Sequence, residues 1–221
     1  MTVGISGYVG NRLTGIGRVL VNVVRELSVQ NPGDEYYIFK NDDYDGFGPV
    51  EDARNVHLVN NGVSKESMAR NLLWHQHGFQ KMLRKYSCDV AYIPNFSLLL
   101  WKVVPTVVTI HDLIEFNIPG KFGKLRMFYR KHICDPLMAR RSDAILTVSE
   151  SSKRDIVRYL HAPESKITVT PNASDDTVFH RYPKQECASA AERFGLGYKD
   201  YFLFVGTIDD AVEKAKKGGK A

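Results

Sequence analysis

The two residues of this sequence best suited to chemistry are adjacent, His111 and Asp112. They follow a run rich in β-branched residues, Thr106 to Ile110, which begins after a proline and has the composition of a strand buried on both faces of a parallel sheet. Such a strand ends at the carboxyl edge of its sheet, where ligands of open α/β folds bind. Imidazole exchanges protons near neutral pH, and an adjacent carboxylate can orient or charge it. We therefore predict a ligand site here, against the alternative of a histidine that only hydrogen-bonds a loop.

A glycine-rich segment after the first predicted strand is the second candidate site. Apolar residues recur at helical spacing from Ile16 to Leu27, so a helix is predicted to begin close to Gly15-Ile16-Gly17. Glycines at a strand-to-helix turn let backbone N–H groups approach an anion, and the helix N-terminus adds partial positive charge. We expect Gly15, Ile16 and Gly17 to contact a phosphate, although a purely geometric need for glycine would give the same pattern.

Strands and helices must alternate along the chain to position these residues. The predicted strands are 3–6, 36–39, 56–59, 89–93, 106–110, 144–148 and 166–170, and the predicted helices are 16–27, 64–86, 122–139, one after Ser149, and 188–194. This alternation implies parallel pairing through right-handed crossovers. The expected fold is therefore an α/β, doubly wound, mostly parallel Rossmann-like sheet.

Local signals refine these elements. Ser64 and Ser149 are expected to cap helices, and Pro136 is expected to kink the helix that contains it. Val157 is expected to face the core together with Ile156 and Leu160. The acidic segment 41–54 is expected to be a loop.

The composition is that of an ordinary globular protein. The chain has 221 residues, 43% of them hydrophobic and 25% charged, and a formal charge of +5, which does not indicate a nucleic-acid partner. It has no apolar run of membrane-spanning length and no signal-peptide pattern, so we expect a cytoplasmic protein. Cys88, Cys134 and Cys187 match neither a disulfide framework nor a metal motif and are expected to be reduced.

Basic and apolar residues are interleaved between positions 121 and 131. The basic members are Lys121, Lys124, Arg126, Arg130 and Lys131, and the apolar members are Phe122, Leu125, Met127, Phe128 and Tyr129. This pattern suits a helix that touches anionic lipid, peripherally at the inner membrane face, or an anionic substrate. A basic solvent face over an apolar core face is the alternative.

A nicotinamide dehydrogenase is one rival interpretation. Gly4, Gly7 and Gly10 have the spacing of the nucleotide fingerprint of short-chain dehydrogenases. Only three residues precede Gly4, however, and the helix is predicted to begin after Gly15 rather than after Gly10.

Metal-dependent and hydrolytic sites are also weakly supported. Asp43 and Asp45 could form a metal-binding acid pair, but they lie among loop-forming residues. Ser149 lacks the Gly-x-Ser-x-Gly context of a hydrolase nucleophile. We expect neither a metal site nor a bound cofactor.

Five segments together resemble the N-terminal, acceptor-side domain of a family 4 glycosyltransferase, a retaining enzyme of the two-domain GT-B architecture. They are Thr14-Gly-Ile-Gly-Arg18, Val108-Thr-Ile-His-Asp-Leu113, Ser142-Asp-Ala-Ile-Leu-Thr-Val-Ser-Glu150 with Ser152-Lys-Arg-Asp-Ile156, Lys166-Ile-Thr-Val-Thr-Pro-Asn172, and Tyr201-Phe-Leu-Phe-Val-Gly-Thr207. Each segment is weakly specific alone, but the five occur in the family's order over nearly the whole chain.

The resemblance implies transfer of a sugar from a nucleotide-sugar donor, which is a substrate and not a cofactor, to a saccharide or lipid-linked acceptor, without a metal. It implies that the Gly15 to Gly17 turn contacts the donor phosphate. It also implies that His111 lies beside the donor sugar at the reacting centre, with Asp112 as a supporting residue.

Three residues that follow other predicted strands are candidates for the acceptor side of such a site. They are Pro94, Asn95 and Asn172. Ala173 departs from the family, which usually has glycine after Pro-Asn, so the resemblance does not predict the backbone conformation of that turn.

The resemblance also predicts how the chain is divided. Residues 1–178 form the Rossmann-like acceptor-side domain, 179–200 a linker, 201–208 the first strand of an otherwise absent C-terminal donor domain, and 209–221 a solvated basic tail. We expect this chain to be inactive alone, to need a C-terminal domain or partner chain, and to self-associate through an exposed apolar face. A non-catalytic Rossmann-like binding or scaffold domain is the alternative function.

Overall fold

The computed structural model describes residues 1–7, 15–42, 46–62, 68–95, 97–117, 123–175 and 179–197. Within these residues, seven strands form one sheet in the order β3-β2-β1-β4-β5-β6-β7, and every neighbouring pair is parallel. The strands are β1 (Thr2–Gly7), β2 (Glu35–Lys40), β3 (Val56–Asn60), β4 (Val90–Ile93), β5 (Thr106–Thr109), β6 (Ala144–Thr147) and β7 (Ile167–Val169). The predicted doubly wound fold is confirmed.

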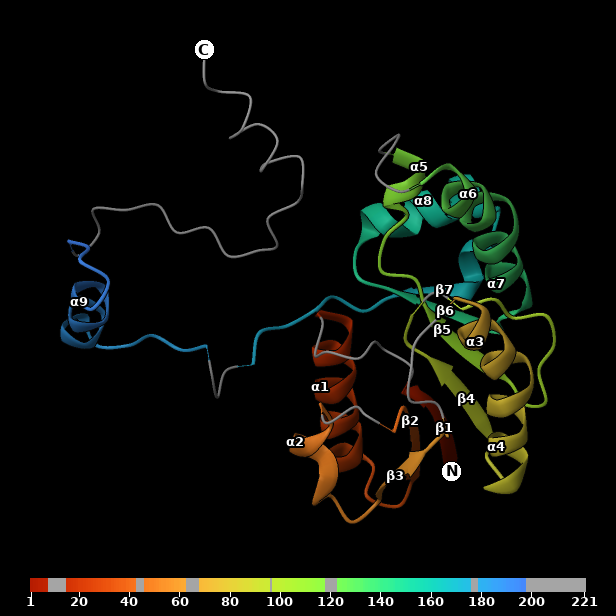
Figure 1. The fold of residues 1–221 in the computed structure, drawn as a ribbon, viewed down its shortest axis with the longest axis horizontal. Coiled ribbons are helices and arrows are strands. Elements are labelled where there is room, and N and C mark those ends of the chain that lie inside the picture. The colour runs from red at the N-terminus through yellow and green to blue at the C-terminus, as the bar shows by residue number, and fades with distance from the viewer. Residues whose placement is uncertain are drawn as a thin grey trace. The chain divides into compact units, whose positions relative to one another are not determined.

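Helices cover both faces of this sheet (Figure 1). One face carries α1 (Gly15–Gln30) and α2 (Gly48–Glu51), and the other carries α3 (Met68–Leu73), α4 (Phe79–Lys85), α7 (Asp135–Arg141) and α8 (Glu150–Leu160). Two short helices, α5 (Ile114–Asn117) and α6 (Lys124–Tyr129), lie in the connection from β5 to β6, and a 3₁₀ turn (Glu164–Lys166) precedes β7. The strand order reverses between β1 and β4, and such a switch point is where open α/β sheets bind ligands.

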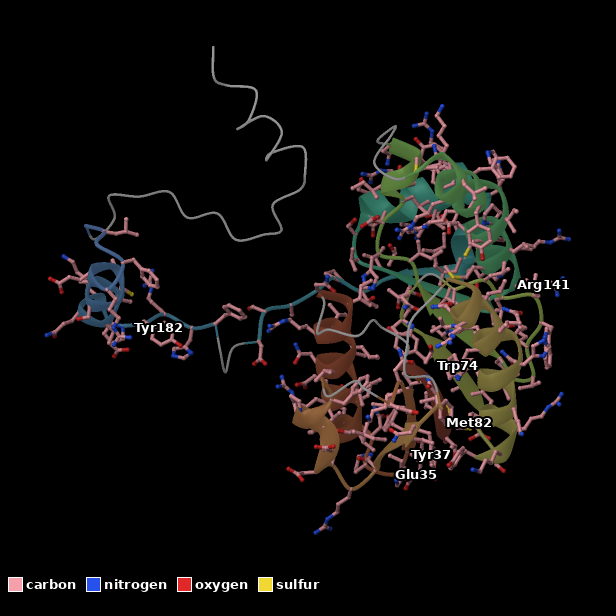
Figure 2. The ribbon with its side chains drawn as sticks, viewed as in Figure 1. Glu35, Tyr37, Trp74, Met82, Arg141 and Tyr182 are labelled. Carbon is pink, nitrogen blue, oxygen red and sulfur yellow. The ribbon has the colours of Figure 1, made fainter. Side chains whose placement is uncertain are left out.

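Each face of the sheet has its own apolar core. Because side chains alternate along a strand, Tyr36 and Ile38 of β2 pack with α1 and α2, whereas Phe39 packs with the helices on the opposite face. Trp74 belongs to that second core, and Met82 packs against it (Figure 2). In β1 and β5 consecutive residues are buried, because helices cover both faces of the sheet.

Two helices that the sequence predicts as continuous contain π-helical turns. Trp74–Gly78 separates α3 from α4, and Arg130–Cys134 separates α6 from α7. Pro136 lies just after the second turn. Proline lacks an N–H group, and its ring clashes with the carbonyl oxygen of the preceding turn of an α-helix, so a regular α-helical turn is disfavoured there. The irregularity expected near Pro136 is therefore a widened turn immediately before it.

In α8 the predicted cap is confirmed and one of the three predicted inward-facing positions is wrong. Ser149 caps α8, where its Oγ accepts a hydrogen bond of 3.1 Å from the N–H of Ser152. Val157 is 37% exposed, so its predicted core position is wrong. Ile156 and Leu160, four residues apart, already fill the inward stripe, and Val157 lies one residue outside it.

Two further predictions concern the segments before β3 and before α3. The segment 41–54, predicted as a loop, contains the single turn of α2. Ser64, predicted to cap the helix before β4, lies outside the described residues.

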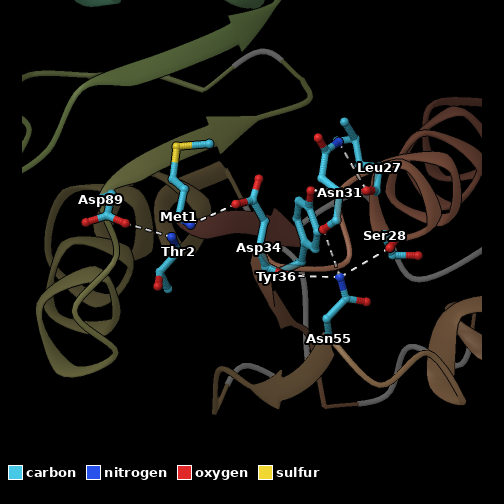
Figure 3. A network of polar contacts seen from close by, with 9 residues as sticks. All are labelled: Met1, Thr2, Leu27, Ser28, Asn31, Asp34, Tyr36, Asn55 and Asp89. Atoms are coloured by element: carbon cyan, nitrogen blue, oxygen red, sulfur yellow. Dashed lines mark hydrogen bonds and ion pairs between the residues drawn. The ribbon is translucent and has the colours of Figure 1, made fainter.

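The amino edge of the sheet is closed by a polar network centred on Asn55 (Figure 3). The side-chain amide of Asn55 donates to the carbonyl oxygens of Ser28, Asn31 and Asp34 at 3.3, 3.3 and 2.9 Å. These bonds tie the C-terminus of α1 to the starts of β2 and β3. At this edge, the backbone carbonyl oxygens of the three residues are therefore engaged in hydrogen bonds that stabilise the fold.

Residues 174–221 form a second unit, separate from 1–173. Its described part contains α9 (Lys184–Glu192), which begins directly after Pro183, four residues before the predicted start of this helix. The predicted strand 201–208 and the tail 209–221 lie outside the described residues.

The close packing at Gly4 gives a test of the fold. A Cβ at Gly4 would lie 2.9 Å from Sγ of Cys88 and closer still to Leu83, whereas a Cβ at Gly33 would have no atom within 4 Å. We expect Gly4→Ala to lower the free energy of unfolding by about 1–3 kcal/mol through overpacking. Gly33→Ala is the matched control and should change it by less than about 0.5 kcal/mol. Urea titration checks both, and equal effects would contradict this packing.

Candidate functional site

The two predicted site regions both follow strands that end at the carboxyl edge of the sheet. β1 ends at Gly7 before α1, and β5 ends at Thr109, two residues before His111. β4 pairs with both strands, so the ends of β1 and β5 are two strand spacings apart, roughly 10 Å. A ligand of moderate size could therefore reach from the end of β1 to the segment after β5.

The imidazole of His111 is partly exposed, and one of its nitrogens is hydrogen-bonded to the backbone after β4. Its Nε2 lies 3.1 Å from the carbonyl oxygen of Pro94. Because a carbonyl oxygen can only accept, Nε2 carries the proton in this bond. In the neutral ring Nδ1 is then unprotonated and can accept a hydrogen bond from a hydroxyl group. Pro94 thus acts through its backbone, as the group that orients this ring.

The backbone around His111 is held from β6 and α8. The N–H of Ile110 donates to the carbonyl of Leu146 at 2.9 Å, and Thr147 Oγ1 donates to the carbonyl of Ile110 at 2.7 Å. Ser152 Oγ donates to the carbonyl of His111 itself at 3.0 Å. Ser152 was not singled out from the sequence, because this contact spans 41 residues and leaves no local signal.

Asp112 is exposed and caps the next helix. Its Oδ1 accepts a hydrogen bond of 3.2 Å from the N–H of Ile114, the first residue of α5. An Asp two residues before the N–H that it binds is a common turn and helix-start contact. Asp112 therefore helps to fix the direction in which the chain leaves His111.

The turn residues at the start of α1 differ in burial. Gly15 is exposed, Ile16 is partly buried and Gly17 is buried. No described atom lies within 4 Å of a Cβ built on Gly15, so packing within the described residues does not require glycine there. The preceding residues, 8–14, lie outside the described part of the chain.

The remaining candidates separate into two groups. Asn95 follows Pro94 after β4, and its Oδ1 accepts a hydrogen bond of 3.3 Å from Ser97 Oγ. Asn172 is exposed beyond β7, two strands away from β5 in the sheet. The fold therefore brings Pro94 and Asn95 to His111 and places Asn172 farther along the same edge.

A buried histidine that sequence reasoning missed lies beneath this edge. His75 is 1% exposed and Ser6 is 0% exposed, and Nε2 of the first is 2.9 Å from Oγ of the second. Nδ1 of His75 lies 2.9 Å from the carbonyl of Asn71, so Nδ1 carries the proton and Nε2 accepts from the Ser6 hydroxyl. Burial lowers the pKa of His75 from 6.5 to about 4, against a smaller opposite effect of the Asn71 carbonyl.

Two glutamines in the same helical segment hold the β4–β5 connection. Gln76 donates to the carbonyl of Leu98 and accepts from the N–H of Leu100 at 2.9 Å, and Gln80 accepts from the N–H of Val103 at 3.1 Å. Both glutamines are buried. One feature of the sequence could have revealed these residues. His75 and Gln76 are adjacent polar residues in a predicted amphipathic helix, at positions where apolar residues would be expected to face the core.

The rival sites are not supported by the described residues. Gly4 lies in the middle of β1, packed against the second core, and not in a nucleotide-binding turn. Burial raises the pKa of Cys88 to about 11, with a further contribution from Asp89, so this thiol is protonated at neutral pH. In the described ranges no three His, Cys, Asp or Glu side chains gather as metal ligands, while Asp43 and Asp45 lie outside them.

Residues 13–178 match the family described as Glycosyltransferase Family 4, which is three quarters of the chain. The chain belongs to glycosyltransferase family 4. This family 4 chain is 28% identical over 206 residues to O-antigen chain mannosyltransferase B of Escherichia coli, with 89% of this chain and 53% of the relative covered. It therefore spans about half the length of that curated relative.

Two solved structures share the fold of this family 4 chain. HepE of Anabaena, in complex with UDP and glucose, has a TM-score of 0.55 at 12% identity, over 88% of this chain and 50% of that one. A glycosyltransferase of Rickettsia africae has a TM-score of 0.55 at 15% identity, over 90% and 50%. These likenesses establish a Rossmann-like half of the GT-B architecture. No described helix of the chain is both long enough and apolar enough to cross a bilayer.

The buried imidazole makes stability depend on pH. The pKa of His75 is about 4 in the folded protein and 6.5 ordinarily, so the unfolded chain binds the extra proton between these values. The stabilisation is present above pH 6.5 and is lost as pH falls toward 4, by on the order of 3 kcal/mol. We expect His75→Asn to flatten this decline. His77→Asn changes an exposed histidine of the same turn and should retain it, as measured by urea unfolding at several pH values. An unchanged slope in His75→Asn would rule out this source.

Proposed function

We propose that this chain supplies the acceptor-side half of a retaining glycosyltransferase that uses a nucleotide-sugar donor. The observation that supports it most is the placement of His111, with Nε2 engaged by Pro94 and Nδ1 able to accept, at the same sheet edge as the start of α1. The family membership limits the reaction class to glycosyl transfer, and the edge provides an imidazole and a helix N-terminus for it.

The chemistry proposed for the site is positioning and charge stabilisation. In the reaction, the bond between the anomeric carbon and the leaving phosphate oxygen breaks while the acceptor oxygen bonds to the same face of the sugar. The leaving diphosphate takes the acceptor's proton. The 16-residue helix α1 would favour the developing negative charge through its N-terminal amides, and Nδ1 of His111 would accept from a sugar hydroxyl. No metal or cofactor is part of this proposal.

The donor and acceptor follow from the relatives as proposals only. The Escherichia coli relative is named as a mannosyltransferase of an O-antigen chain, and HepE was solved with UDP and glucose. We therefore propose a hexosyl donor, with GDP-mannose and UDP-glucose as first probes, and a saccharide or lipid-linked acceptor. Because the chain spans about half of its relative, we propose that turnover needs a C-terminal, donor-binding domain.

The role of His111 is tested in a chimera of this chain with the C-terminal half of the Escherichia coli relative. We expect His111→Ala to lower kcat about a hundredfold or more, because a preorganised polar contact to the reacting sugar is lost. His57→Ala, on β3 and stacked on Tyr37, is the control and should leave kcat unchanged. Sugar release and transfer are measured with each donor probe.

Each contrary result of that experiment has its own meaning. Full turnover in His111→Ala would favour a scaffold domain whose imidazole has no chemical role. Turnover by the 221-residue chain without the second half would overturn the proposed division of labour.

A matched serine pair tests how His111 is held. Ser152 donates to the carbonyl of His111, whereas its neighbour Ser151 is exposed on the same turn of α8. In the chimera, Ser152→Ala should lower kcat by up to about tenfold, the value of one hydrogen bond, with a smaller effect on KM. Ser152→Thr keeps the hydroxyl and should restore kcat, and Ser151→Ala should have no effect. Wild-type kcat in Ser152→Ala would show that this bond does not position the imidazole.

A further inference from the structure

The helix α6 and the π-helical turn after it present apolar side chains to solvent. Leu125 is 78% exposed, Phe128 56% and Ile133 38%. None of the six residues of α6 is buried. A basic helix that covers the core with its apolar face, the alternative considered from the sequence, would bury these side chains. That alternative is wrong for Leu125 and Phe128, which require another explanation, whereas Met127 and Tyr129 are partly buried.

Positive charge surrounds these apolar side chains. Residues 123–134 include four basic residues, Lys124, Arg126, Arg130 and Lys131, and no acidic residue. Lys124 and Arg126 are exposed on either side of Leu125. Arg130 is mostly buried, with its Nε 3.7 Å from Asp135 Oδ1, so it belongs to the interior and not to this surface. Lys131 is partly buried, with its amine over the ring of Phe116 at 5.2 Å.

We propose that Lys124, Leu125, Arg126, Phe128 and Ile133, here called the α6 face, dock this protein on an anionic membrane surface. A bilayer with anionic headgroups offers phosphate charge at its surface and hydrocarbon just below it, which matches a face that combines exposed bulky apolar groups with basic ones. A free anionic substrate would use the charges but not Leu125 and Phe128. A nucleic acid would leave the same apolar groups without partners.

The position of the α6 face links docking to the proposed site. The connection from β5 leaves the carboxyl edge at His111, passes through α5 and α6, and then returns through α7 to the start of β6. α6 thus belongs to the part of this connection nearer the carboxyl edge (Figure 1). If the proposed function holds, docking would favour a lipid-linked acceptor over a soluble saccharide. Docking itself needs no turnover, so its test is independent of that function.

The test is co-sedimentation of the 221-residue chain with vesicles at low ionic strength. We expect binding to phosphatidylglycerol–phosphatidylcholine vesicles and at least tenfold weaker binding to phosphatidylcholine alone. The double change Lys124→Glu with Arg126→Glu should weaken binding by about tenfold or more, because each basic residue near the surface contributes to the attraction. Leu125→Ser with Phe128→Ser should weaken it comparably by removing apolar insertion.

The matched control removes the same charge from another exposed helix. Arg154→Glu with Arg158→Glu makes the same charge change on α8, where Glu150 of the helix and Glu164 of the following 3₁₀ turn line the same surface pocket, and should leave binding within about twofold. Circular dichroism and gel filtration of each variant monitor folding and association. Equal binding to both vesicle types, equal loss in the α8 control, or an apolar variant that dissociates an oligomer while vesicle binding persists would each overturn the proposal.

Discussion

The site depends on one hydrogen bond between the ends of neighbouring strands, from Nε2 of His111 to the carbonyl of Pro94. Because β4 and β5 are parallel, both chain segments emerge at the same edge, and residue 94 comes into reach of residue 111. The bond determines which ring nitrogen carries the proton and therefore which can accept from a ligand. A loop without this constraint would leave the tautomer and the orientation of the imidazole to solvent.

A buried polar layer makes that constraint rigid. His75, Gln76 and Gln80 project from the helical segment over β1 and β4 and bind Ser6 and the backbone of the β4–β5 connection. Each buried polar atom without such a partner would lower the stability by roughly 1–3 kcal/mol. The π-helical turn at Trp74–Gly78 adds a residue to the turn and allows adjacent positions 75 and 76 both to face the interior. The π-helical turn thus helps to place the side chains of the buried polar layer.

The sequence predicted the strands and helices, which have local patterns, and missed the side-chain contacts between residues far apart in the chain. Short apolar or β-branched segments bounded by turn residues located all seven strands of the sheet in the described residues, since strands buried on both faces are rich in such residues. The same reasoning placed His111 at a strand end and Ser149 at a cap, because both follow from local order along the chain. It could not find Ser152, whose partner is 41 residues away, or the contacts of the buried His75 with Asn71 and Ser6. Contacts across the fold carry no periodic signal, and an interrupted helix has the same apolar spacing as a continuous one over most of its length.

The Ser6–His75 pair also shows why proximity of reactive groups does not define a catalytic site. A serine hydroxyl 2.9 Å from an imidazole nitrogen has the distance of a nucleophile and its base. Both side chains are sealed from solvent, however, and the other ring nitrogen is bound by a backbone carbonyl and not by a carboxylate that would stabilise an imidazolium. The lowered pKa keeps His75 neutral and a weak base. The pair therefore offers no accessible hydroxyl at this edge, whereas the imidazole of His111 is partly exposed there.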